Sequence, residues 1–393
     1  MITAALLGLG LVMVTSASID IADRQLGNPF YYTERQLAFI VLGLATAFLV
    51  SKIRLKNWEV AGMGLLVFTF FLLALVLVPG LGRTVNGSTR WLSLGLVNLQ
   101  VSELARLMMT IYLAGYLVRR GHEVRASFKG FIKPVMLLAF AALLLLMEPD
   151  FGGAVVLLAI GFGMLYLGGV RLGQFGLLIL LAAGAMALLA ISSPYRLQRL
   201  TTFLNPWADP FNSGFQLTQS LIAIGSGAWS GAGLGDSIQK LFYLPEAHND
   251  FLFAVLAEEL GLIGVVTVIA LYAGLVWRAF SIGAMASRAG SVFGSSLAYG
   301  IGIWLGLQAF VNMGVNMGLL PTKGLTLPLM SAGGSSMIVM LAAIGFLQRV
   351  YRESQEGFQE QFGVVAAVQG LLSQRKKGNV RVVRRPKETR HAA

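Results

Sequence analysis

The chain contains no cysteine and little charge. The absence of cysteine excludes disulfides, thiolate catalysis and cysteine-based metal sites. The histidines are too few and too scattered for a zinc site, because they stand far apart at His122, His248 and His391. Only 12% of the residues are charged, and 18 of the 393 are acidic. An ordinary soluble domain carries about twice that share of charge, so the composition excludes one.

Apolar residues are abundant instead: they make up 56% of the chain, and the mean hydropathy is +0.73. Runs of about 20 apolar residues recur, which predicts an all-α, polytopic membrane protein with about ten transmembrane helices. The first run is short and has no basic leader, so we expect a shortened N-terminus and no cleavable signal. The ten runs cover residues 1–17, 35–51, 58–80, 102–118, 132–147, 153–170, 172–192, 251–277, 294–318 and 328–348.

The basic residues predict the orientation of the protein in the membrane. Lys and Arg number 30, and they cluster after the second, fourth, sixth and eighth runs and in the tail. The positive-inside rule then places both termini in the cytoplasm. The net charge of +12 is explained by topology and contact with anionic lipid. No aromatic residues interleave the basic run of the tail, so no nucleic acid is expected as a partner.

We therefore expect one ten-helix membrane domain over residues 1–350 and a basic cytoplasmic tail over 351–393. On this topology the outer face holds three segments, 81–101, 193–250 and 319–327. The connection 193–250 is too long to be structureless in a compact protein, and such segments are usually functional. Its aromatic content predicts short amphipathic pieces that pack on the membrane surface.

A cluster of polar residues at the end of this connection is the strongest candidate site. The run Tyr243-Leu-Pro-Glu-Ala-His-Asn-Asp-Phe251 puts Glu246, His248 and Asp250 just before an apolar helix. Charge is costly near lipid, so such a cluster at a membrane boundary indicates a site. The alternative is that Asn249 or Asp250 merely caps the next helix.

Further charged residues lie at the starts of other spans. Glu103 and Arg106 are three residues apart on one helix face and can form a pair, either structural or ligand-binding. Glu148-Pro-Asp150 breaks the chain between two spans, as a polar turn or as a site for a cation or a sugar hydroxyl. Glu258 and Glu259 lie inside the eighth span, where pairing within the bundle is expected.

The run Pro321-Thr-Lys-Gly324 and the glycines that follow it predict close packing between helices. Lys323 is the exception, because a cation there would face the outer side. The spacing of a phosphate-binding loop is absent.

Taken together and in order over residues 9–350, these segments resemble the SEDS family (shape, elongation, division and sporulation). The run over 321–328 resembles the division branch, FtsW, more than the elongation branch, RodA. The motifs are Asn86-Gly-Ser-Thr-Arg-Trp91, Gln100-Val-Ser-Glu103, Glu148-Pro-Asp150, Asn205-Pro-Trp-Ala-Asp-Pro210, Gly214-Phe-Gln-Leu-Thr-Gln-Ser220, Gly233-Leu-Gly235, Gln239-Lys240, Tyr243-Leu-Pro-Glu-Ala-His248 and Pro321-Thr-Lys-Gly-Leu-Thr-Leu-Pro328.

The resemblance implies a SEDS fold and a peptidoglycan glycosyltransferase of the bacterial inner membrane that polymerises lipid II at the division septum. It places the family's catalytic acid on Asp250. The alternatives are a lipid II flippase and a division scaffold without catalysis. The chain departs from the family pattern at five positions, and each departure puts full activity in question. They are Val101, Ser226, Ala228, Asn249 and Ala332.

Polymerising an α-linked lipid diphosphate into a β-1,4 glycan inverts the anomeric carbon, so one step suffices. The step needs a base, for which Asp250 is the candidate, and positive charge for the leaving diphosphate. A helix N-terminus would keep Asp250 ionised and weakly basic, whereas desolvation would raise its basicity; the sequence leaves this open. Candidate cations on the outer face are Arg90, Lys240, Lys323, Arg196 and Arg199. The other expected substrate-binding residues are Glu246, His248, Glu103, Arg106 and Asp150.

A divalent cation, Mg or Mn, is a further expectation, with Asp150 and Asp250 as its potential ligands. The family resemblance also implies several partners. These are lipid II, the lipid-linked glycan chain, a class B penicillin-binding protein with transpeptidase activity (FtsI-like) and other membrane proteins of the divisome. We expect the transpeptidase to contact the outer loops and a small-residue face of the ninth span, with Gly300, Gly302 and Gly306.

Overall fold

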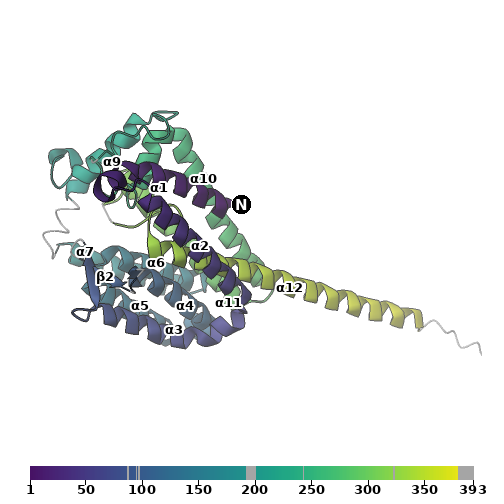
Figure 1. Cartoon of the computed structure of the whole chain (residues 1–393). Helices are drawn as coiled ribbons and strands as arrows, with labels where there is room; N and C mark the ends of the chain where they lie inside the picture. The colour runs from purple at the N-terminus through teal and green to yellow at the C-terminus, as the bar shows by residue number, and fades with distance from the viewer. Residues whose placement is uncertain are drawn as a thin grey trace, which may run out of the picture.

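The computed structural model describes residues 1–85, 88–93, 95, 98–191, 201–241, 243–321 and 324–378. Helices form a bundle, and a small sheet covers part of one end (Figure 1). The long helices are α1 (Ile2–Leu26), α2 (Tyr31–Lys52), α3 (Leu55–Val76), α4 (Val101–Ala126), α5 (Phe128–Met147), α6 (Phe151–Leu167), α7 (Leu172–Ile191), α10 (Leu252–Arg288), α11 (Val292–Asn316) and α12 (Gly334–Gly378). Shorter elements are β1 (Gly82–Val85), β2 (Ser88–Ser93), β3 (Asn98–Gln100), η1 (Pro206–Ala208) and α9 (Phe215–Ser226).

The predicted spans are confirmed as helices. Within the described residues, eight helices are long and apolar enough to cross a membrane, and the apolar stretches of α6 and α7 are shorter. Each of the ten overlaps one predicted run. Several helices run beyond their predicted ends: α1 continues to Leu26, where Gly27 takes a left-handed φ of 66°, α10 continues to Arg288 and α12 to Gly378.

Where the sequence predicted only a loop, β1, β2 and β3 form a three-stranded antiparallel sheet in the order β1-β2-β3. Gly82 pairs with Leu92, and Trp91 pairs with Gln100. β3 runs directly into α4 at Val101. The sheet therefore fixes the strand that carries Arg90 and Trp91 against the start of α4.

Close helix pairs build the bundle: α12 packs along α2, α10 along α11 and α3 along α4. Small residues permit these approaches. A Cβ atom added to Gly345 would lie 2.5 Å from the carbonyl oxygen of Ala47. Gly300 and Gly302 serve the same purpose inside the bundle, where an added Cβ would meet Thr110 at 2.6 Å and Ala279 at 3.1 Å. The expectation of a free small-residue face on α11 is therefore wrong for these two glycines.

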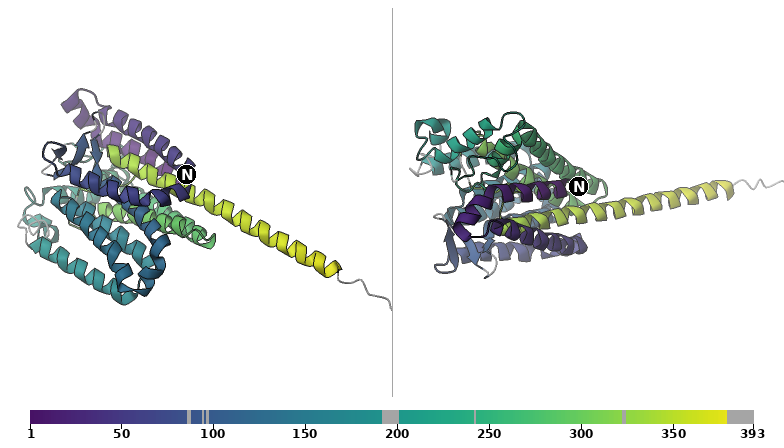
Figure 2. Two further views of the ribbon diagram at one scale, coloured as in Figure 1. Left: turned by 90° about the horizontal axis from the view of Figure 1, so that it is seen from below. Right: turned by 45° about the horizontal axis from the view of Figure 1, so that its top comes forward.

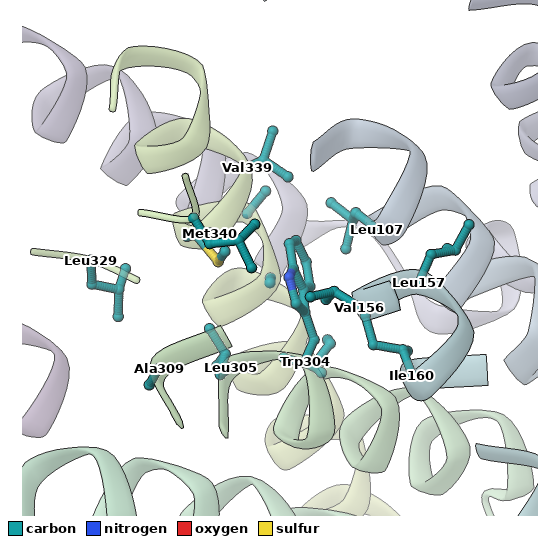
Figure 3. Packing of buried hydrophobic residues seen from close by; sticks show 14 of the residues in the cluster. Leu107, Val156, Leu157, Ile160, Trp304, Leu305, Ala309, Leu329, Val339 and Met340 are labelled. Carbon is teal, nitrogen blue, oxygen red and sulfur yellow. The ribbon is translucent and has the colours of Figure 1, made fainter. Parts of the chain in front are cut away.

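The core is centred on Trp304 of α11, which is fully buried. Figure 3 shows its indole between Leu107 of α4, Val156 of α6 and Met340 of α12. Its Nε1 donates a hydrogen bond to Gln308 Oε1 at 2.9 Å. Packing on three sides holds α11 at the centre of the bundle, where its polar side chains can reach several elements.

The helix α10 is broken at Gly261. Gly261 in α10 has φ 63° and ψ −162°, a conformation that requires glycine. The outer connection runs into the break: Ala232 N donates to Glu258 O at 2.9 Å, and Leu262 N donates to Ala228 O at 3.0 Å. The carbonyl and amide groups freed by the break are thus satisfied by the connection. The sequence predicted this span as continuous.

The connection between α7 and α10 carries η1 and α9 within its described part. α9 packs against α10 and α11, with Leu217 and Ala223 buried. This agrees with the expectation of short amphipathic pieces. Large side chains remain exposed along the connection, among them Trp207, Phe211 and Trp229.

At the other end of the sequence, α12 is a single helix that projects well beyond the bundle (Figures 1 and 2). It passes through the predicted boundary at residue 350 and continues to Gly378.

Candidate active site

Asp250 lies in the turn that precedes α10, not on the helix. Its side chain is half-buried, and within the described residues its carboxylate has no hydrogen-bond partner. The residue does not cap α10, because the N-cap position is Phe251 and has no side-chain cap. Asn316 of α11 supplies that interaction instead, since its Oδ1 accepts from Ala254 N at 3.2 Å. The carboxylate of Asp250 is left available for chemistry.

The backbone of Asp250 is held from α11. Asn312 Nδ2 and Asn316 Nδ2 both donate to Asp250 O, at 2.9 Å and 3.0 Å. One turn earlier, Gln308 Nε2 donates to Thr326 O at 3.1 Å. These three amides are four residues apart on one face of the helix. We call Gln308, Asn312 and Asn316 the amide ladder.

The segment between α11 and α12 completes the wall around Asp250. A Cβ atom added to Gly324 would lie 2.8 Å from Asp250 Oδ2, so a larger residue there would displace the carboxylate. Ser331 Oγ donates to Asn249 O at 2.6 Å. Ala332 N donates to His248 O at 3.0 Å. The predicted close packing between helices is confirmed at Gly334 of α12, where an added Cβ would lie 2.8 Å from the ring of Phe39 in α2. The predicted cations Lys323, Arg196 and Arg199 lie outside the described residues.

The surroundings of Asp250 make it a stronger base than an ordinary aspartate. Burial raises the pKa of its carboxyl to about 7, with a smaller contribution from the charge of Glu246. The charge of Arg90 lowers the pKa and so limits the rise. Desolvation therefore outweighs the factors that keep Asp250 ionised. Near neutral pH the group can both lose and accept a proton.

Arg90 also faces a second pair of acids. Its Nη1 lies 3.6 Å from Asp150 Oδ1, which caps α6 by accepting from Gly153 N at 2.9 Å. Glu148 is buried and has no partner for either oxygen among the described residues. Burial raises the pKa of Glu148 to about 8; Asp150 adds to the shift and Arg90 opposes it. Arg90 is thus the cation shared by Asp250, Asp150 and Glu148.

These acids do not form a metal centre by themselves. In the part of the chain that the structure describes, no group of three or more His, Asp or Glu residues could hold a metal ion. Asp150 Oδ1 is already engaged by Gly153 and Arg90, and Glu148 favours its neutral form at neutral pH. The divalent cation stays a prediction, and no step below depends on it.

His248 and Asn249, just before Asp250, line a cavity of about 180 Å³. Trp91 of β2 and Arg35 of α2 line the same cavity. The ring of His248 lies 4.4 Å from that of Tyr32, and burial lowers the pKa of the imidazole, so His248 is neutral at pH 7. Glu246 is exposed and accepts a hydrogen bond from Asn249 Nδ2.

Glu103 and Arg106 form the predicted pair, with Arg106 Nη2 3.3 Å from Glu103 Oε1. Arg106 is 0% exposed, and its Nη1 donates to Gln308 Oε1 at 2.7 Å. The pair lies in the core and joins α4 to the amide ladder. It supports the wall around Asp250 from inside the bundle.

Lys240 is not brought to Asp250. Its ammonium group is buried and uses all three donors, on Glu259 Oε1 at 2.8 Å, Ser16 Oγ at 3.0 Å and Gly235 O at 2.6 Å. The predicted pairing is confirmed for Glu259, which forms an ion pair with Lys240. Glu258 instead accepts hydrogen bonds from Ser237 Oγ and the Ile238 amide of the outer connection. We call Ser16, Lys240 and Glu259 the buried triad.

Sequence analysis missed two contributors to this site. One is the amide ladder, whose signal is the spacing of Gln308, Asn312 and Asn316 in an apolar helix, where polar side chains need partners. The other is Arg35, which only the fold brings beside Trp91 and His248.

The departures noted in the sequence serve local structure. Val101 is buried at the start of α4, and Ser226 Oγ donates to Ala223 O at 2.8 Å. Ala228 has a φ of 42° and accepts from the Leu262 amide beside the break in α10. Ala332 contributes its amide rather than its side chain.

Comparison with known proteins supports the motif evidence. Residues 1–356 match the family model for the FtsW, RodA and SpoVE cell cycle proteins. The chain is 66% identical over 366 residues to a probable peptidoglycan glycosyltransferase FtsW of Thioalkalivibrio sulfidiphilus, covering 93% of this chain and 92% of that one. It is 62% identical to a protein of the same name from Nitrosococcus halophilus, covering 89% and 90%.

Two solved structures share the fold. A peptidoglycan synthase complex that coordinates polymerisation and crosslinking contains a chain with a TM-score of 0.73 and 31% identity, covering 90% of this chain and 96% of that one. The rod shape determining protein RodA of Thermus thermophilus matches with a TM-score of 0.66 and 31% identity, covering 90% and 95%.

Proposed function

The chain belongs to the FtsW, RodA and SpoVE family of cell cycle proteins, and we propose that it is the peptidoglycan glycosyltransferase of septal wall synthesis. Its substrate is lipid II, which it polymerises into β-1,4 glycan strands. One observation carries the proposal: among the described residues the half-buried carboxylate of Asp250 has no hydrogen-bond partner, while its backbone is fixed by the amide ladder.

Asp250 acts as the general base of a single inverting displacement. It takes the proton of the acceptor sugar's 4-hydroxyl as that oxygen attacks the anomeric carbon, and the lipid diphosphate leaves. A base is most useful when its pKa lies near the working pH. The pKa of about 7 satisfies this condition, whereas an exposed aspartate would be too weak a base.

The developing charge on the leaving diphosphate calls for a cation near Asp250. Arg90 is the favoured group, because it is 23% exposed and its charge acts on Asp250. Arg35 lines the adjoining cavity with His248, where it can meet a second phosphate or the sugar. Lys240 is the weaker candidate in this conformation, since its donors are used inside the buried triad.

The charged side chains that the structure describes inside the bundle argue against the flippase alternative. A polar path needs groups that face a passage, but Glu103, Arg106 and Glu259 are engaged in buried ion pairs. Glu258 accepts hydrogen bonds from the outer connection. These groups stabilise the bundle rather than line a route through it.

The decisive experiment is polymerisation of lipid II by the purified chain, with products resolved by length. Asp250→Asn keeps the shape of the side chain but cannot accept the proton, so we expect loss of glycan products by about 100-fold or more. Asp236→Asn is the matched control, because Asp236 is an exposed acid in the same connection. Normal product from Asp250→Asn, with the same melting temperature as the parent, would reject the base.

We further infer that both termini are cytoplasmic, that the protein is enriched at the septum and that it works with a class B penicillin-binding protein. The matched synthase complex supports the last point, because it joins polymerisation to crosslinking. The exposed side chains of Trp207, Phe211 and Trp229 offer the partner an apolar surface on the outer connection. Co-purification that survives in the parent and is lost in Phe211→Asp would support this interface.

A further inference from the structure

A second cavity lies at the opposite end of the bundle from Asp250. It has a volume of about 380 Å³ and lies between the ends of α4, α6, α10 and α11. The polar groups that line it include Arg125, Ser295, Ser296 and Tyr299, and the apolar ones include Leu117 and Met164. The catalytic proposal makes no use of this cavity.

The polar groups of the cavity have unused hydrogen-bonding capacity. Ser295 is 7% exposed, yet among the described residues its hydroxyl has no partner. Arg125 donates from Nε to Gly168 O at 2.9 Å, and neither of its terminal nitrogens has a partner in the described chain. Because the Ser295 hydroxyl lines the cavity, a ligand that accepts from it and from Arg125 adds hydrogen bonds that the described chain leaves unmade.

The cation is held in place. The bond from Arg125 Nε to Gly168 caps the end of α6, and a Cβ atom on Gly169 would come within 3.2 Å of that nitrogen. The bond from Nε therefore restricts the directions in which the terminal nitrogens of Arg125 can point. Ser295 and Ser296 belong to the first two turns of α11, whose N-terminal end attracts negative charge. The Arg125 cation, the two serine hydroxyls and the N-terminal end of α11 all favour the binding of an anion.

We propose that this cavity binds the phosphate headgroup of an anionic glycerophospholipid such as phosphatidylglycerol. The site lies at the ends of membrane-spanning helices, where lipid headgroups are concentrated. Leu117 and Met164 provide an apolar wall below the polar groups, which suits the glycerol and upper acyl carbons of a lipid better than a free anion. In the proposed orientation the lipid comes from the cytoplasmic leaflet, which is rich in anionic headgroups.

The test is native mass spectrometry of the full chain in detergent, titrated with phosphatidylglycerol, phosphatidylcholine or inorganic phosphate. We expect one tightly retained phosphatidylglycerol. In Arg125→Gln and in Ser295→Ala/Ser296→Ala the affinity should fall by about tenfold or more, because charge-assisted bonds are lost. Arg171→Gln is the matched control: Arg171 also donates to one backbone carbonyl, that of Ala126 at 3.1 Å, but does not line the cavity.

Three results would overturn the proposal. The first is equal retention of phosphatidylglycerol by the parent and all variants. The second is equal loss in Arg171→Gln and Arg125→Gln, which would indicate general surface charge. The third is binding of inorganic phosphate that matches the lipid in affinity. The double serine variant leaves the cap on Gly168 intact, so a folding defect of Arg125→Gln cannot mask the answer. Polymerisation by Asp250 plays no part in this readout.

Discussion

At the level of single residues, Asp250 combines a fixed backbone with a free carboxylate. Two amides bond its carbonyl oxygen, and in the described part of the chain no group bonds either carboxylate oxygen. The charge of Glu246 raises the pKa of Asp250 and the charge of Arg90 lowers it, so substitutions can shift this pKa in either direction.

The pH dependence of polymerisation should reveal this balance. The carboxylate form is the active one, so the rate should rise with pH through a midpoint near 7. Glu246→Gln removes a charge that raises the pKa, and the midpoint should move to lower pH. Arg90→Gln removes the opposing charge, and the midpoint should move higher. Rates measured between pH 5 and 9 check both shifts. If the midpoint is the same in the parent and in the Glu246 and Arg90 variants, a group other than Asp250 controls the rise in rate with pH.

Glu148 predicts a separate effect, on stability. Its pKa of about 8 in the folded chain exceeds the ordinary value of 4.5, so the folded state binds more protons between these values. Stability from this group is fully present below pH 4.5 and is lost as pH rises through 8, by up to about 1.4 kcal/mol per unit. Glu148→Gln should melt at a temperature less sensitive to pH in this window. If the melting temperature of Glu148→Gln depends on pH as strongly as that of the parent, Glu148 is solvated and its pKa is not raised.

At the level of elements, α11 is the positioning helix of the site. Its amide ladder reaches the turn that carries Asp250, the first turn of α10 and the segment after Gly324. Arg106 supports the ladder from α4 through Gln308. Substitutions in this helix should therefore change the rate of the reaction although their side chains do not contact substrate.

Asn316→Leu should reduce both stability and turnover. It removes the acceptor for Ala254 and one donor to Asp250, at a cost of about 1–3 kcal/mol for the unsatisfied groups. We expect kcat to fall by about tenfold with KM little changed, because the base is misplaced rather than the substrate lost. Gln216→Leu on α9 is the control, since that amide is exposed. A change confined to KM would contradict a positioning role.

Hydrophobic runs predicted the ten spans well because the lipid leaves the backbone few alternatives to helix. The same reasoning could not predict the sheet over 82–100, whose strands are only three to six residues long and depend on pairing with one another. Nor could it find the break at Gly261, because the segment that bonds to the break comes from residues 228–232, some 30 positions away. Motifs located Asp250 and Arg90, whereas the amide ladder needed the fold.

At the level of the whole molecule, the buried triad joins three distant parts of the chain. Ser16 belongs to α1, Lys240 to the outer connection and Glu259 to α10. Lys240 is 3% exposed and Glu259 is 1% exposed. Removing one member of such a pair leaves an uncompensated charge in the bundle.

Lys240→Met should therefore destabilise the protein by about 3–5 kcal/mol, and Lys240→Met/Glu259→Met should recover much of that loss. If Lys240 serves structure alone, the double variant also recovers polymerisation. If the Lys240 ammonium group contacts the diphosphate of the substrate, the double variant should be stable but should polymerise lipid II slowly. Melting temperatures and rates measured on the same samples separate the two outcomes.

The length of α12 has a mechanical consequence. Its 45 residues span about 68 Å at 1.5 Å per residue, roughly twice the thickness of a bilayer core. One end, at Gly334, follows directly on the segment whose amide and hydroxyl groups hold His248 and Asn249. The other end extends far from the bundle (Figure 2). In the proposed orientation α12 thus connects the cytoplasmic side to the turn before Asp250, so a force applied to its distal end would be transmitted to the residues that precede Asp250.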